Sequence, residues 1–147
     1  MVEFSLLQAL VVGPLVGLLA TLVMDVVMRV LPEGRTPPRV AAGVLTDTPV
    51  DDAPQRLATW VHYVAGAGSG LLFLGVATLL TALLPGTVSL FAAAIVMFGL
   101  MVGFFVVVPL PRAGGLSRQR VRQVSRDWAI MAATYLLVAT VLFVVLG

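Results

Sequence analysis

Long segments without a single charged residue constrain this chain more than any other feature. One segment runs from Phe4 to Met24, which is 21 residues, and another covers the last 20 residues, Trp128 to Gly147. Between them, no charge occurs from Tyr63 to Pro111. A hydrocarbon core of ~30 Å is crossed by about 20 apolar residues in a helix. The central segment is long enough to cross twice, so the sequence predicts four transmembrane helices.

Composition agrees with a chain that lies mostly in lipid. Of the 147 residues, 60% are hydrophobic and 11% are charged, whereas a soluble domain is about 25% charged. There is no cysteine, which excludes disulfides, thiolate metal sites and thiol nucleophiles. We therefore predict an all-α integral membrane protein, folded as a single four-helix domain over residues 1–147.

Polar and helix-breaking residues place the boundaries of the four helices. Asp51 and Asp52 precede Pro54, which is typical of a helix start, and Pro85-Gly86 marks a tight break between the second and third helices. We expect helices at about 4–31, 54–84, 88–108 and 126–146. Two polar connections remain. In the first, residues 40–45 either form one short helical turn or lie at the membrane interface. The second has a short surface helix capped by Ser117, with Ser125 as the N-cap of the last spanning helix.

Arginine alone supplies the positive charge, and its distribution predicts the orientation. Four arginines flank or occupy the first polar connection and five lie in the second: Arg112, Arg118, Arg120, Arg122 and Arg126. By the positive-inside rule, both connections lie on the cytoplasmic side of the cell membrane. Both termini and the short hairpin then lie on its outer side. The five clustered arginines either contact anionic lipid headgroups or only fix the topology. No aromatic residue or helix motif accompanies them, so we expect no nucleic-acid partner.

Three pairs of glycines have the four-residue spacing that allows two membrane helices to approach closely. The pairs are Gly13 and Gly17, Gly66 and Gly70, and Gly99 and Gly103. They predict close helix packing, either within one chain or between copies. A homo-oligomer, or a complex with another membrane protein, is therefore among the expected states.

A small set of polar residues is the candidate functional cluster. Asp25 lies inside an apolar helix, where a carboxylate suggests function, but Arg29 is in register to form an ion pair with it. His62 is the only histidine and is either a proton relay or ligand, or an interfacial anchor beside Trp60 and Tyr63. If the first two helices pack through their glycines, Asp25, Arg29 and His62 meet, with Asp127 at the same depth.

Enzyme motifs are missing from the sequence. It has no H-E-x-x-H, no G-x-S-x-G and no cluster of metal ligands, and Ser69 lies two helical turns from His62. We therefore expect no catalytic residue, no metal and no cofactor. Two functions stay open. The first is a non-enzymatic structural, lipid-interacting or accessory role. The second is a small proton-coupled transporter or carrier that uses Asp25 and His62 and acts as an oligomer.

Four short stretches resemble the YagU-like family of small inner-membrane proteins. They read GLLATLVMD, PEGRTPPRVA, WVHYVAGAGSGLLF and VVVPL. The resemblance implies a four-helix membrane bundle and adds no catalytic role, because the family has no established activity. It also implies that His62 stands where the family has a histidine early in its second helix. The family's second histidine, early in the last helix, is replaced here by the sequence SRDWAIM with Asp127, which argues against a role that needs two histidines.

Overall fold

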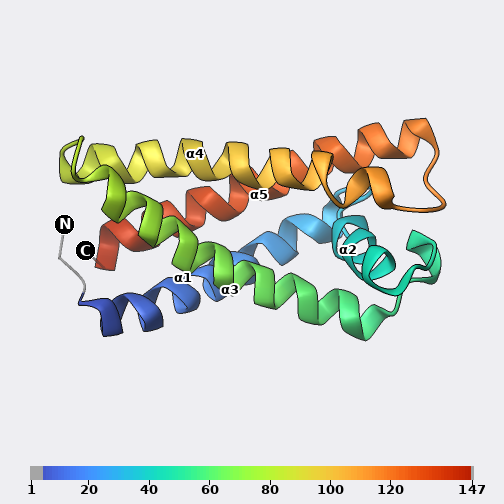
Figure 1. Cartoon of the computed structure of the whole chain (residues 1–147), viewed down its shortest axis with the longest axis horizontal. Helices are drawn as coiled ribbons and strands as arrows, with labels where there is room; N and C mark the ends of the chain where they lie inside the picture. The colour runs from blue at the N-terminus through green and yellow to red at the C-terminus, as the bar shows by residue number, and fades with distance from the viewer. Residues whose placement is uncertain (1–4, 147) are drawn as a thin grey trace.

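The computed structural model describes residues 5–146, which form five α-helices and two short 3-10 helices (Figure 1). In chain order they are α1 (Leu6–Val30), α2 (Thr36–Thr46), η1 (Val50–Asp52), α3 (Gln55–Leu80), α4 (Gly86–Val107), η2 (Leu110–Arg112) and α5 (Arg118–Leu146). The described residues contain no β-strand. The predicted all-α fold is confirmed.

Four of these helices are long and apolar enough to cross a membrane: α1, α3, α4 extended by η2, and α5. Their outward faces carry many exposed large hydrophobic side chains, among them Leu19, Phe91 and Leu137. Such continuous apolar surface is unusual for a soluble monomer and is the expected surface of a helix in lipid. The structure is therefore that of a multi-pass membrane protein.

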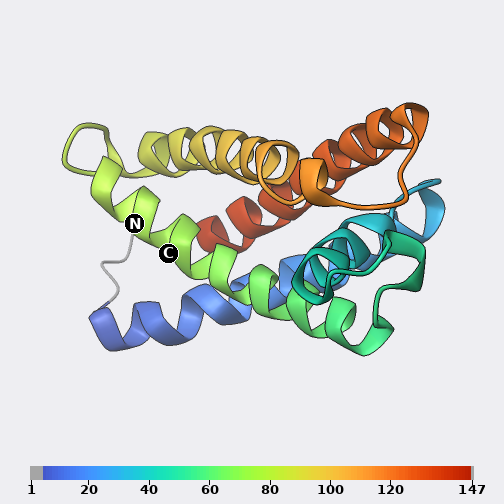
Figure 2. The same ribbon diagram turned by 45° about the vertical axis from the view of Figure 1, so that its right-hand side comes forward.

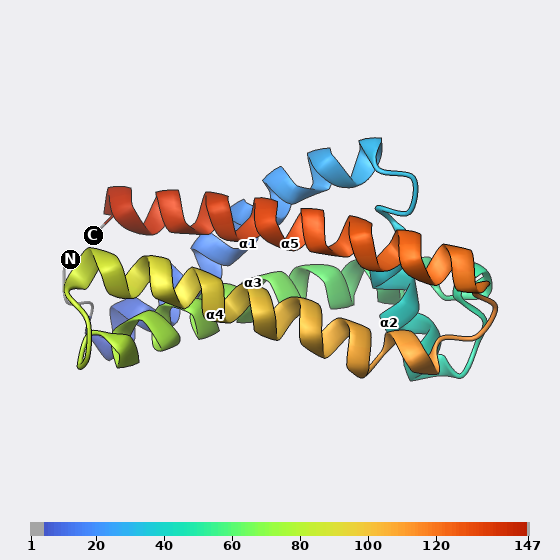
Figure 3. The same cartoon turned by 90° about the horizontal axis from the view of Figure 1, so that it is seen from above.

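The bundle has two different ends (Figures 1 and 3). The first turn of α1, the last turn of α5 and the α3–α4 turn lie together at what we call the hairpin end. At the opposite end, the loop end, lie α2, η1 and η2. From the hairpin end, α3 and α4 diverge, and α2 lies at the open side of the resulting wedge (Figures 1 and 2).

The helix starts and ends differ from the prediction in several places. The predicted start at Phe4 lies outside the described residues. The side chain of Ser5 caps α1 in a capping box with Gln8, which is the reciprocal hydrogen bonding typical of a helix start. In the first connection, α2 has 11 residues where a single turn or an interfacial segment was expected.

The separate start of the last spanning helix was predicted wrongly. α5 is one continuous helix of 29 residues that begins at Arg118. The predicted cap Ser117 does accept a hydrogen bond from the backbone N–H of Arg120, at 3.2 Å. Ser125 is not an N-cap, because its hydroxyl donates to the carbonyl oxygen of Val121, at 2.8 Å, inside the helix. The polar first turns of α5 extend the apolar span without a break.

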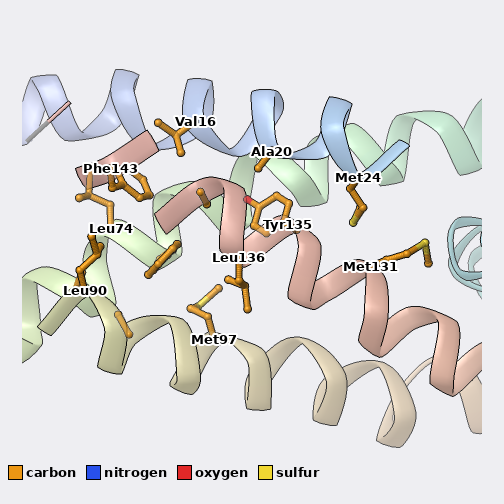
Figure 4. Close-up of a cluster of buried hydrophobic side chains, with 14 residues drawn as sticks. Val16, Ala20, Met24, Leu74, Leu90, Met97, Met131, Tyr135, Leu136 and Phe143 are labelled. Carbon is orange, nitrogen blue, oxygen red and sulfur yellow. The ribbon is translucent and has the colours of Figure 1, made fainter. Parts of the chain in front are cut away.

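The main core lies where α1, α3, α4 and α5 meet, and Tyr135 of α5 is its largest fully buried side chain (Figure 4). A smaller core at the loop end joins α2 to η1, α4, η2 and α5. Its buried members are Val40, Val50, Phe105, Leu110 and Val124. This second cluster holds α2 in place, since each of these elements contributes an apolar side chain to it.

Candidate functional site

Glycines bring α1 and α3 into backbone contact. A Cβ atom on Gly70 would lie 2.6 Å from the Cα and the N of Gly17, and one on Gly13 would lie 2.8 Å from the Cα of Leu71. A Cβ on Gly66 would collide with the hydroxyl of Thr21. No side chain fits at these positions unless the helices separate. The first two predicted glycine pairs therefore lie at this crossing, which fixes α1 against α3 near the polar cluster.

Tyr135 joins a third helix to the same crossing. Its hydroxyl donates to the carbonyl oxygen of Gly66 at 2.6 Å in a buried hydrogen bond. A tyrosine in the middle of an apolar span needs such a partner, and this signal was available in the sequence although it was not used. Gly99 and Gly103 behave differently, because a Cβ on either would meet nothing within 4 Å. They mediate no close packing within residues 5–146.

Asp25, His62 and Tyr63 form a hydrogen-bonded group beside the glycine crossing of α1 and α3. The Nε2 of His62 lies 2.6 Å from one carboxylate oxygen of Asp25, and the hydroxyl of Tyr63 donates to the other at 2.5 Å. The side chain of His62 is only 9% exposed and that of Asp25 only 19%. His62 therefore lies against Asp25 and does not reach outward as Trp60 does, which is 70% exposed.

The other two members of the predicted cluster do not join this group. Arg29 forms no ion pair with Asp25 within the described residues, because α3 supplies both partners of the carboxylate. Asp127 lies in the third turn of α5, not in its first turn, and shares no hydrogen bond with Asp25 there. The hydrogen-bond and ion-pair partners of Asp25 and Asp127 thus differ from those that the sequence predicted.

Asp127 is completely buried and ties α5 to the segment that follows α1. One carboxylate oxygen accepts a hydrogen bond from the backbone N–H of Glu33 at 2.8 Å. The other accepts from the guanidinium of Arg126 at 2.9 Å. Its surroundings thus satisfy both oxygens, as a buried charge requires, and its role is to hold the loop end together.

A second ion-pair network at the loop end was not predicted. The guanidinium of Arg120 lies 2.8 Å from an oxygen of Glu33 and 3.0 Å from an oxygen of Asp51, so it joins α5 to the first connection and to η1. The hydrogen bond from Arg120 lowers the pKa of Glu33 and that of Asp51. Arg120 therefore has a structural role at the loop end.

Of the other four arginines in this cluster, two bond to neighbouring groups of the protein and two are exposed. Arg126 pairs with Asp127, and Arg112 donates to the carbonyl oxygen of Val108 at 2.5 Å. Arg118 and Arg122 are exposed on the first turns of α5 and take part in none of the ion pairs among the described residues. Contact of all five clustered arginines with anionic lipid headgroups stays a prediction.

An apolar cavity of about 370 Å³ occupies the wedge between α3 and α4. Its inner wall includes Tyr135 and Trp128 of α5 and Met24 of α1, and Pro37 and Pro38 of α2 close it at the loop end. We call it the wedge cavity. Leu72 and Phe104, which flank it, are more than half exposed. The cavity therefore opens sideways on a surface that faces lipid. It arises from the divergence of two helices and has no signal in the sequence.

A second, polar cavity of about 190 Å³ lies beside the first. It is lined by Asp25, Met28, Arg29, Arg35, Pro38, Gln55, Ala58, Thr59, His62 and Tyr63, and we call it the polar cavity. His62 and Pro38 line both cavities. The histidine that bonds Asp25 is therefore also the wall between a polar space and an apolar one.

In residues 5–146, no three side chains of His, Asp or Glu lie together as a metal site would need. Compared with protein families, curated proteins and solved structures, the chain matches none. The resemblance to the YagU-like family therefore stays a prediction, and the two cavities and the Asp25 group are the basis for assigning a function.

Proposed function

We propose that this chain is a non-enzymatic membrane protein that binds the hydrocarbon chain of a lipid-like amphiphile in the wedge cavity. The observation that carries the proposal is an apolar cavity within the spanning helices that opens toward lipid between α3 and α4. Its volume lies within the ~300–1,000 Å³ of typical small-molecule sites. Among the two roles expected from the sequence, this supports the lipid-interacting one.

The proposal includes an orientation in the cell membrane. All nine arginines occur at or near the loop end, in the last turn of α1, the connections, and the first turns of α3 and α5. By the positive-inside rule this end is cytoplasmic. The polar mouth of the site then opens near the cytoplasmic leaflet, and the hairpin end lies on the outer side.

Blocking the wedge cavity is expected to abolish binding of a chain. Gly68 lines the cavity, and a Cβ on it meets nothing within 4 Å, so Gly68→Leu places a side chain in the cavity without disturbing the helix packing. With the protein in nanodiscs and a hexadecanol that carries a diazirine in its chain, we expect at least tenfold less labelling of cavity residues in Gly68→Leu. Mass spectrometry of the labelled peptides measures it.

Gly75 supplies the matched control. It lies on the same helix, also meets open space, and does not line the cavity, so Gly75→Leu adds the same side chain elsewhere. Labelling in this variant should equal that of the native protein. Equal labelling in native protein and Gly68→Leu would mean that the chain contacts only the outer surface, and the proposal would fail.

A second candidate function, a proton-coupled carrier, is supported by the hydrogen-bonded Asp25–His62–Tyr63 group, which lines the polar cavity. Histidine serves as a proton shuttle in many proteins. In liposomes with an internal pH-sensitive dye and an imposed gradient, this function predicts proton flux that falls at least tenfold in Asp25→Asn. Asp52→Asn, at an exposed residue of η1, is the control. Equal flux in native protein and Asp25→Asn would remove this function.

A further inference from the structure

The wedge cavity and the polar cavity form one continuous amphipathic surface. His62 and Pro38 belong to both linings. On one side of His62 the lining is apolar, with Val61, Ala65 and Leu72 of α3. On the other side it carries Thr59 and Tyr63 of the same helix. A molecule with an apolar chain and a polar end would match both parts at once.

The polar cavity carries an excess of positive charge. Arg29 and Arg35 both line it, and within residues 5–146 neither forms an ion pair or a side-chain hydrogen bond, whereas Arg39 bonds Gln55 and Arg120 bonds Glu33. Asp25 is the sole carboxylate among the lining residues, and His62 and Tyr63 already occupy its two oxygens. The two arginines are therefore available to an anionic group.

We propose that the two cavities together bind a single-chain amphiphile with a phosphate monoester headgroup. Arg29 and Arg35 hold the phosphate in the polar cavity, and the chain passes His62 into the wedge cavity. This inference rests on the proposed function, since it assigns the headgroup of the same ligand.

Phosphate fits this polar cavity better than a carboxylate does. A phosphate monoester carries a charge of about −1.5 to −2 at pH 7 and three acceptor oxygens, and guanidinium groups bind such oxygens through paired hydrogen bonds. Two arginines, with the Gln55 side-chain amide also in the lining, supply more donors than the two oxygens of a carboxylate can accept.

Competition against the labelled hexadecanol tests the headgroup. Hexadecyl phosphate, palmitate and unlabelled hexadecanol are titrated against native protein in nanodiscs of neutral phosphatidylcholine. We expect hexadecyl phosphate to reach half-displacement at a concentration at least tenfold below that of hexadecanol and at least threefold below that of palmitate. In Arg29→Gln/Arg35→Gln, the phosphate should lose this advantage while hexadecanol displaces as before.

The control removes the same charge at a distance from the polar cavity. Arg118→Gln/Arg122→Gln changes two exposed arginines of α5 that line neither cavity and should leave all three half-displacement concentrations unchanged. A similar loss in this variant would assign the effect to general surface charge and overturn the inference. Palmitate that displaces as well as the phosphate, or a phosphate no better than hexadecanol, would overturn it also, with the proposed chain binding intact. If none of the three displaces the label, the chain binding itself fails.

Discussion

Gly70→Ala should lose about 3 kcal/mol of unfolding free energy, although it adds only one methyl group. Adding bulk to a packed interior costs about 1–3 kcal/mol where side chains can yield. The added Cβ would lie 2.6 Å from the backbone of Gly17, and backbone cannot change rotamer. The helices must separate instead. This separation would also strain the hydrogen bond from Tyr135 to Gly66 at the same crossing. Unfolding in mixed micelles with increasing sodium dodecyl sulfate measures the loss.

Gly75→Ala is the internal control for this prediction. Gly75 lies on the same helix but a Cβ there meets open space. Because alanine favours a helix over glycine by ~1 kcal/mol, this variant should be as stable as the native protein or more so. If both variants unfold at the same detergent fraction, the backbone contact between α1 and α3 is not what holds the bundle together.

Hydropathy was sufficient to predict the four spans because a bilayer requires long apolar segments, and these are visible residue by residue. Hydropathy did not show that α5 begins at Arg118, because it registers only the apolar part of a helix. The first turns of α5 alternate arginines with Val121 and Val124, which average to a polar segment. Val124 is fully buried in the loop-end core. The surface helix predicted here was thus separated from the spanning helix, although the two form one continuous helix.

Within the candidate site, the sequence predicted that Asp25 and His62 meet, but it did not predict which side chains bond to Asp25. The glycine spacing indicated that α1 and α3 approach closely, which leads to the meeting of Asp25 and His62. Arg29 stood in register with Asp25 on the same helix, yet Tyr63 of α3 takes the second oxygen. Partners across two helices depend on their rotation about their axes, and a local spacing rule contains no information about that rotation.

The wedge cavity follows from two features that have no sequence signature. Contact of α3 with α1 at the glycines draws α3 away from α4, and the loop-end core positions α2 across the gap between them. Each wall residue would appear as an ordinary apolar residue of its own helix. Arg29 and Arg35 can be found in the sequence. That they line a polar cavity next to the apolar wedge cavity follows only from the three-dimensional structure.

Asp127→Ala is expected to open the loop end and to cost about 2–3 kcal/mol. The carboxylate is fully buried and accepts the backbone N–H of Glu33 at 2.8 Å, and a buried donor left without a partner costs about 1–3 kcal/mol. The ion pair with Arg126 is lost as well. Asp127→Asn keeps an acceptor oxygen for the N–H of Glu33 and should lose roughly half as much.

Hydrogen exchange and detergent unfolding together check this prediction. The backbone amides around Glu33 should exchange faster in Asp127→Ala, while those of α1 and α3 at the glycine crossing keep their native protection. Asp52→Ala, at an exposed carboxylate of η1, should change neither measurement. Because the segment after α1 leads directly into α2, release of that segment also loosens Pro37 and Pro38 at the wedge cavity. Weaker labelling by the hexadecanol probe in Asp127→Ala would therefore link the buried carboxylate to the binding site, whereas native exchange around Glu33 would show that other contacts hold the loop end.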